Sequence, residues 1–223
     1  MAFTKTKFCT ISHKENDKSI KEVLKAVKNA ETQNKKLFQI SPNQYFIDVV
    51  YSNKEYDKKT GLTKIKTDRG GYVHINRITI ISLQVRKLPF DLKSFFYHEI
   101  NHIFYATLIG NYPPVWFSEG MATYLMKTYK IDIEGWKKFF RAVDNPEKFL
   151  YYRYIKVKYF ATIEEFYTLS FLIYRYLDKK YGKENIMNLL KEFSKEPSKH
   201  KFDDLFKKYF KFTIKEIVQK AIN

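Results

Sequence analysis

The sequence predicts an α+β fold, because strand-like segments precede residue 90 and helical segments follow it. The β-branched and aromatic run from Tyr45 to Tyr51 indicates one strand, and the alternating run from Val73 to Leu83 indicates a second, long one. Beyond residue 90, apolar residues recur at helical spacing. A chain of 223 residues fits one domain, so the change near residue 90 indicates two lobes rather than two domains.

The expected domain spans residues 19–223, with an N-terminal lobe over about residues 19–110 and a C-terminal lobe over about residues 111–223. Residues 1–18 are polar and charged, and we expect a leader outside the domain. They lack the apolar segment of a signal peptide, and no stretch reaches the roughly 18 apolar residues of a membrane span. We therefore expect a cytoplasmic protein without a membrane span.

Local signals mark several element boundaries. Asp57 to Gly61 is expected to be a loop after the first strand. Thr162 and Glu165 form a capping box that predicts the start of a helix, which should end near Gly182. A second capping box, Thr213-Ile214-Lys215-Glu216, predicts the start of the last helix.

Charge and cysteine content bound the possible partners. The net charge of +17 raises nucleic acid or an anionic surface as a partner. The lysines are scattered singly and in pairs, however, and no nucleic-acid-binding motif accompanies them, so we favour a solvated lysine surface. The single cysteine, Cys9, excludes an internal disulfide and favours a reducing compartment. We expect Cys9 to be incidental in a mobile leader rather than a metal ligand.

Residues 98–102 carry the most informative motif, His-Glu-x-x-His, within an apolar run. A chain of this composition should contain only about 0.007 such motifs by chance. Residues four apart on a helix share one face about 6 Å apart along the axis, so His98 and His102 can reach one metal ion. Glu99 lies one step round the helix, where it can hold a water molecule. The apolar neighbours predict a buried helix that starts near Asp91 and stops at Gly110.

A catalytic zinc site needs three protein ligands and an open position. The metzincin arrangement is excluded, because Tyr105 and Leu108 stand where it requires Gly and His. The better candidate is Glu119, at the start of a second helix after a double proline. Two helices with a short connection pack antiparallel, which brings Glu119 toward the histidines. Position alone explains Glu119 equally well as a glutamate that the helix dipole favours.

The two motifs together, His-Glu-x-x-His and then Trp-Phe-Ser-Glu-Gly-Met-Ala-x-Tyr over residues 116–124, resemble the gluzincin zinc metallopeptidases, most of all the peptidase MA-like family. The resemblance implies a thermolysin-like catalytic domain, with a small N-terminal β-sheet lobe, an active-site helix and a helical C-terminal lobe. It also implies one Zn²⁺ per chain bound by His98, His102 and Glu119. Glu99 is then the general base that hydrolyses peptide bonds through zinc-activated water.

Further roles in catalysis and substrate binding follow from this resemblance. Tyr167 is the expected donor to the oxyanion, with Tyr174 in reserve on the same helix. The strand Val73–Leu83 is the expected edge strand, which pairs with an extended peptide. His74 is expected to be a core or solvated residue. Four aromatic residues are candidates for apolar pockets, although packing alone explains them more readily: Phe90, Phe95, Trp116 and Phe117.

The rival interpretation is a zinc-containing binding protein that is not a peptidase. Such a protein would use its basic surface to hold nucleic acid or a protein partner. The presence of Glu99 speaks against it, because a purely structural site has no need of that base. The sequence therefore predicts a zinc metallopeptidase with a peptide or protein substrate.

Overall fold

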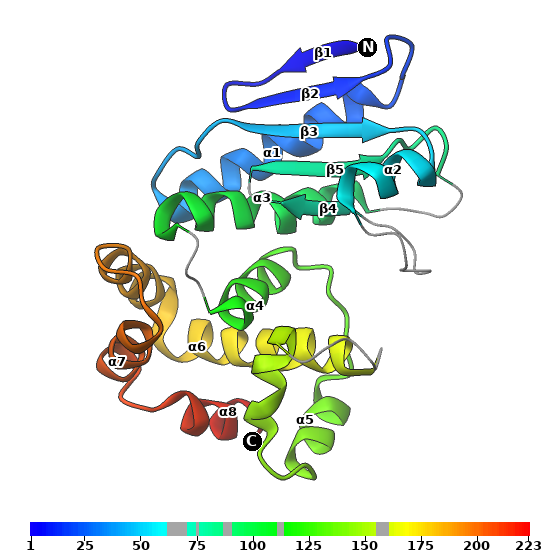
Figure 1. The fold of residues 1–223 in the computed structure, drawn as a ribbon. Coiled ribbons are helices and arrows are strands. Elements are labelled where there is room, and N and C mark those ends of the chain that lie inside the picture. The colour runs from blue at the N-terminus through cyan, green and yellow to red at the C-terminus, as the bar shows by residue number, and fades with distance from the viewer. Residues whose placement is uncertain (62–70, 75, 87–90, 111–113, 155–160) are drawn as a thin grey trace. The chain divides into compact units, whose positions relative to one another are not determined.

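The computed structural model describes residues 1–61, 71–74, 76–86, 91–110, 114–154 and 161–223. The chain divides into two compact units, Met1–Thr107 and Leu108–Asn223, which Figure 1 shows as ribbons. Among the described residues all strands belong to the first unit, and the second unit is helical. The α+β class is thereby confirmed, and the division after Thr107 lies close to the lobe boundary expected near residue 110.

The first unit is built on one sheet, whose described strands follow the order β1-β2-β3-β5-β4. Their bounds are β1 Ala2–Lys5, β2 Cys9–His13, β3 Tyr45–Val50, β4 Gly71–His74 and β5 Arg77–Ile81. The central pairs, β2 with β3 and β3 with β5, are parallel, whereas β1 with β2 and β4 with β5 are antiparallel. Parallel neighbours need crossover connections. The connection from β2 to β3 contains α1 (Ile20–Phe38), and α2 (Asn53–Thr60) follows β3.

Two sequence-based predictions about strands are wrong. Residues 1–18 are not a leader outside the domain, because they contain β1 and β2, and β2 pairs with β3. The run Val73–Leu83 is not one strand but includes parts of the hairpin β4–β5. Within it β5 lies between β3 and β4 and is not an edge strand, so the edge belongs to β4. Strand propensity indicates extended residues but not where the chain turns back on itself.

A third correction concerns α2, which occupies most of the loop predicted at Asp57–Gly61. The Ser52 hydroxyl caps the helix by accepting a hydrogen bond from the Glu55 backbone N–H, at 3.1 Å. The Glu55 carboxylate accepts from the Tyr51 backbone N–H at 2.8 Å. This reciprocal arrangement closely follows the capping box. The sequence signal for this cap is the Ser-x-x-Glu pattern of residues 52–55.

Different helices cover the two faces of the sheet. Figure 1 shows α1 running along one face of the sheet. Tyr45, Ile47 and Val49 alternate along β3 and are all buried. The Tyr45 hydroxyl donates to the Glu31 carboxylate of α1 at 2.8 Å. On the opposite face, Tyr56 of α2 forms a small apolar cluster with the ends of β3 and β5. The face of the sheet that α1 covers is therefore part of the core of this unit.

Cys9 belongs to this core and not to a mobile segment. Its side chain in β2 is 1% exposed. Burial, with nearby Glu31, raises the pKa of the Cys9 thiol far above its ordinary value. Because metals bind the thiolate rather than the thiol, this position gives Cys9 a packing role.

The second unit is helical in its described residues. Its elements are α4 Val115–Leu125, α5 Ile133–Arg141, the 3₁₀ segment η1 Pro146–Tyr154, α6 Ala161–Phe193, α7 Lys199–Phe210 and α8 Ile214–Ile222. Gly182 interrupts α6 with φ 78°, so the helix end predicted there is confirmed. The Thr213–Glu216 capping box is confirmed with both of its hydrogen bonds. The described part of α6 begins at Ala161, and the Thr162 side chain of the other predicted capping box lies outside the described residues. None of the described helices is both long and apolar enough to cross a membrane.

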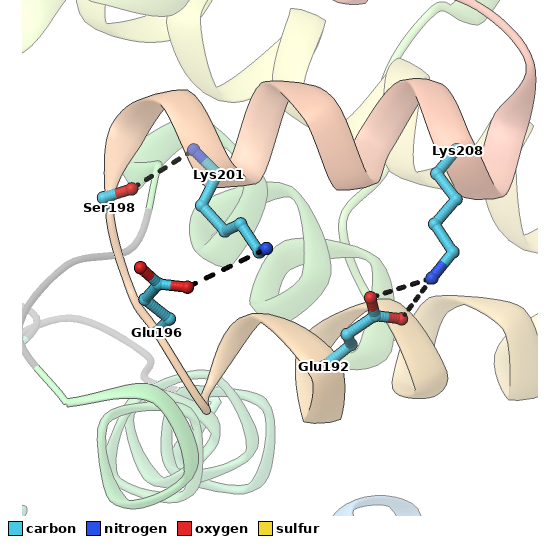
Figure 2. Close-up of polar contacts among 5 residues, drawn as sticks. All are labelled: Glu192, Glu196, Ser198, Lys201 and Lys208. Carbon is cyan, nitrogen blue, oxygen red and sulfur yellow. Dashed lines mark hydrogen bonds and ion pairs between the residues drawn. The ribbon is translucent and has the colours of Figure 1, made fainter.

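Ion pairs join α6, α7 and the loop between them at the surface (Figure 2). Lys208 donates to both carboxylate oxygens of Glu192 at 2.8 Å, and Lys201 lies 3.9 Å from Glu196. Ser198 caps α7 by accepting from the Lys201 backbone N–H. Exposed ion pairs of this kind add little net stability. The apolar packing beneath is made by a run of aromatic rings: Phe193, Phe202, Phe206 and Phe210.

The helices α4 and α6 approach each other closely at Gly120. A Cβ atom added there would lie 2.3 Å from the backbone oxygen of Ser170 and 3.2 Å from the Cβ of Tyr174. A backbone atom cannot move aside alone, so only glycine allows the two helices to lie this close. Gly120 directly follows Glu119, and the contact therefore determines where α4 carries that carboxylate.

We predict that Gly120→Ala lowers the free energy of unfolding by about 2 kcal/mol, since enlarging a packed residue typically costs about 1–3 kcal/mol. Urea denaturation followed by circular dichroism measures the loss. Gly135→Ala is the comparison: its added Cβ would meet the side chain of Asp132, which caps α5 by accepting from the Gly135 backbone N–H at 3.0 Å, so there we expect only the loss of a cap, about 1 kcal/mol. Equal losses in the two variants would contradict a tight contact between α4 and α6.

Candidate metal centre

The helix α3 (Leu92–Ile109) carries the His-Glu-x-x-His motif, and its start and end are both defined. Asp91 accepts hydrogen bonds from the Ser94 backbone N–H at 3.0 Å and from the Ser94 hydroxyl at 2.5 Å. This is the N-terminal cap expected from the sequence. Gly110 follows the last turn with φ 75°, a conformation that glycine adopts without strain. Both predicted boundaries are confirmed.

α3 turns one side to the core and leaves the other half-exposed. Phe96, Ile100 and Phe104 are fully buried. At 100° per residue they lie on the side of the helix opposite the motif histidines. His98, Glu99 and His102 are half-buried. The helix is thus not buried all round, as its composition had suggested, and its polar face remains reachable.

A buried pair of amides holds α3 against α1. The Asn101 side chain, wholly buried, donates to the Asn34 side-chain oxygen at 2.8 Å. Asn34 in turn donates to the backbone oxygen of Ala30 at 3.0 Å. The Phe38 and Phe104 rings, 5.8 Å apart, pack beside them. Since a buried amide is costly without its partner, this pair fixes the rotation of α3 about its axis.

The two motif histidines converge at their Nε2 atoms, which lie 3.1 Å apart. Their rings meet edge to face, with centroids 4.8 Å apart and an angle of 79° between planes. Two nitrogens on one tetrahedral zinc, each at about 2.0–2.1 Å from it, stand about 3.4 Å apart. The two Nε2 atoms are therefore close to the separation that one bound zinc ion requires. The same separation also suits a hydrogen bond between the imidazoles, whose tautomers decide the donor.

Glu119 is the candidate for the third donor. It lies in the second turn of α4, with 4% of its surface exposed. One carboxylate oxygen of Glu119 and one ring nitrogen each of His98 and His102 all lie within 4.8 Å of one another. Two imidazoles and one carboxylate form a donor set of catalytic zinc sites, which leaves a further position open. The residues present thus fit a zinc ion.

The two candidate tyrosines of α6 differ in their surroundings. Tyr167 is half-buried, and its ring lies 5.6 Å from that of Phe166. Tyr174 is fully buried and packs against Phe117 and Tyr124, with ring centroids 5.7 and 5.5 Å away. Tyr174 is therefore a core residue, whereas Tyr167 is only partly buried.

The aromatic residues considered for pockets are mostly core. Trp116 packs against Phe117, Phe202 and Phe206, and both Trp116 and Phe117 are buried, so the pocket interpretation fails for them. Phe95 is half-buried against Phe96. Phe90 and the side chain of His74 lie outside the described residues.

No family model matches the chain, and a search of the curated proteins finds no match for it. The assignment of the site therefore depends on the motif and on the geometry of its residues. Sequence reasoning missed the pair Asn34–Asn101, which positions the histidines. The sequence does contain a signal for this pair: Asn101 lies inside an otherwise apolar helix, and a buried asparagine needs a hydrogen-bond partner.

We predict that the purified protein binds one zinc ion per chain through His98, His102 and Glu119. His98→Ala, His102→Ala and Glu119→Gln should each weaken zinc binding at least about 100-fold, because loss of even an outer-shell partner typically costs 10- to 100-fold. Competition with a chromogenic chelator and elemental analysis measure it. His200→Ala, an exposed histidine of α7, is the control. A wild type without zinc, or an equal loss in the control, would contradict the assignment.

Proposed function

We propose that the protein is a zinc metallopeptidase, with a thermolysin-like catalytic domain, that hydrolyses peptide bonds in a peptide or protein substrate. The observation that carries the proposal is the set of His98, His102 and Glu119 within 4.8 Å, with Glu99 between the histidines on α3. Structural zinc sites use four protein ligands, whereas three ligands with an adjacent carboxylate are typical of catalytic ones.

A zinc ion held there supplies a Lewis acid that makes water acidic near neutral pH and polarises a carbonyl group. Glu99 follows His98 directly and is not part of the three-residue metal set. Its half-buried carboxylate is suited to accept a proton from the attacking water and to pass it to the leaving amine. The hydrogen bond from Asn101 to Asn34 fixes the rotation of α3 about its axis and thereby the positions of His98 and His102.

Tyr167 is the proposed donor to the oxyanion that develops on the substrate carbonyl. The partial exposure of this residue supports the role, since the hydroxyl of a fully buried tyrosine could not meet a substrate. One such donor is typically worth about 2.7–4 kcal/mol in the transition state. The proposed binding edge for an extended peptide is β4, the last strand of the described sheet on that side.

Glu99→Gln is predicted to retain zinc and fold while turnover falls about 10²- to 10⁴-fold, because the change removes the base and no ligand. Cleavage of casein or of a fluorogenic peptide, with zinc content measured on the same samples, tests this. Glu184→Gln, an exposed glutamate of α6, is the control. A Glu99→Gln enzyme with more than about a tenth of wild-type activity would require another base. A zinc-loaded wild type that cleaves no peptide would favour the binding-protein alternative.

Tyr167→Phe is predicted to lower kcat by about 10²- to 10³-fold with little change in KM, since its hydroxyl contacts only the developing oxyanion. Tyr174→Phe is the matched control on the same helix. There we expect an unchanged kcat, because Tyr174 is buried in the core and cannot meet a substrate. Steady-state kinetics and thermal melting on both variants separate the roles. An unchanged kcat in Tyr167→Phe would remove that residue from the catalytic set.

A further inference from the structure

Five exposed lysines form a stripe along α1: Lys21, Lys25, Lys28, Lys35 and Lys36. At 100° per residue they fall within about 100° of the helix circumference. At a rise of 1.5 Å per residue, the stripe is about 22 Å long from Lys21 to Lys36. We call this surface the α1 lysine stripe. Along the chain these lysines look scattered, and only the helix aligns them.

The stripe carries charge of one sign. No ion pair joins any of its lysines to another residue in the part of the chain that the structure describes. The acidic residues of α1, Glu22 and Glu31, lie about 90° round the helix from its centre. Glu31 is also buried, where it accepts hydrogen bonds from Thr6 at 2.9 Å and Tyr45 at 2.8 Å.

Some other lysines of the protein are paired with carboxylates. Lys59 pairs with Asp48 at 2.9 Å, and Lys208 pairs with Glu192 at 2.8 Å (Figure 2). Mixed pairs of this kind are what a solvated, ion-rich surface displays. The α1 lysine stripe differs from these pairs because its five lysines share one side of a helix and none of them has an ion-pair partner among the described residues.

The helix also presents the stripe in a fixed direction. Val23, Val27 and Ala30 are buried on the opposite side of α1. The hydrogen bonds from Tyr45 to Glu31 and from Asn101 to Asn34 fix the rotation of α1 on the sheet. A pre-oriented row of charges loses less conformational freedom on binding than lysines on a mobile loop.

We propose that the α1 lysine stripe binds the phosphate backbone of double-stranded nucleic acid without regard to sequence. A duplex carries one negative charge per 1.7 Å of its axis, so about 22 Å lies along six or seven base pairs. Lysine is a point charge that binds phosphate, and backbone contacts position a protein without reading bases. The stripe contains no side chain with the planar, bidentate geometry used to read a base edge.

Two other polyanions fit the stripe less well. A helix that lies on a membrane inserts its apolar face between the lipids, but the apolar face of α1 is buried in the protein core. Single-stranded nucleic acid is held largely by bases stacked on aromatic rings, and the stripe contains none. Charge is therefore the only means by which the stripe can bind, and this suits the regular array of phosphates on a duplex.

Fluorescence anisotropy with a labelled 20-base-pair DNA duplex of mixed sequence, between 50 and 200 mM salt, tests the proposal on the full chain. The test variant is Lys25→Gln with Lys28→Gln and Lys35→Gln. The control removes the same charge from exposed positions on α2, α5 and α6: Lys54→Gln, Lys138→Gln and Lys183→Gln. Lysine and glutamine have similar helix propensities, so both variants should fold, as circular dichroism checks.

The wild type should bind the duplex, with an affinity that falls steeply as salt rises. The test variant should reduce the slope of log K against log salt by about 2.7, at about 0.9 per lost phosphate contact, and the control should reduce it by less than about 1.

Equal effects of the two variants would show that only total charge matters and would overturn the proposal. It would also be overturned by a wild type that does not bind at 50 mM salt. A test variant that binds the duplex like the wild type, but binds phosphatidylserine vesicles less well than the wild type, would overturn it too. Zinc content and peptide cleavage should be unchanged in the test variant, so the outcome is independent of the proposed catalytic function.

Discussion

The rotation of α3 about its axis is the constraint on which the candidate site depends. Its apolar side is packed into the first unit, and the hydrogen bond from Asn101 to Asn34 ties it to α1. A turn of even one residue would move Asn101 off its partner and turn apolar rings toward solvent. With the rotation fixed, His98 and His102 bring their Nε2 atoms to 3.1 Å. The metal-binding geometry is therefore a consequence of core packing and not of the site residues alone.

The same logic applies to Glu119 in the second unit. Gly120 lets α4 approach the Ser170 backbone of α6, and Phe117 packs on Tyr174 one turn earlier. Phe117 and Gly120 thus determine the position of α4, which carries the Glu119 carboxylate. This gives a physical reason for glutamate and glycine to stand side by side in the second motif. A larger residue at Gly120 would displace the ligand as well as weaken the packing.

The sequence predicted those features whose causes lie within a few residues. The Asp91 cap, the Gly110 stop, the histidine spacing and the Thr213 capping box are all local signals. The errors concern partners distant in the chain. β1 and β2 resemble a polar leader because their alternate residues point away from the core. Between β4 and β5 the turn-favouring residue is a single asparagine, Asn76, in a run that is otherwise rich in β-branched residues. The α1 lysine stripe follows from helical periodicity, although its lysines look scattered along the chain.

The measurement that tests the central claim most directly is an anomalous-scattering map of zinc-soaked crystals at the zinc absorption edge. We expect one peak per chain, about 2.0–2.2 Å from Nε2 of His98, Nε2 of His102 and a carboxylate oxygen of Glu119. A peak elsewhere, or a third ligand other than Glu119, would contradict the account. So would the absence of any peak in crystals where the two imidazoles remain hydrogen-bonded to each other.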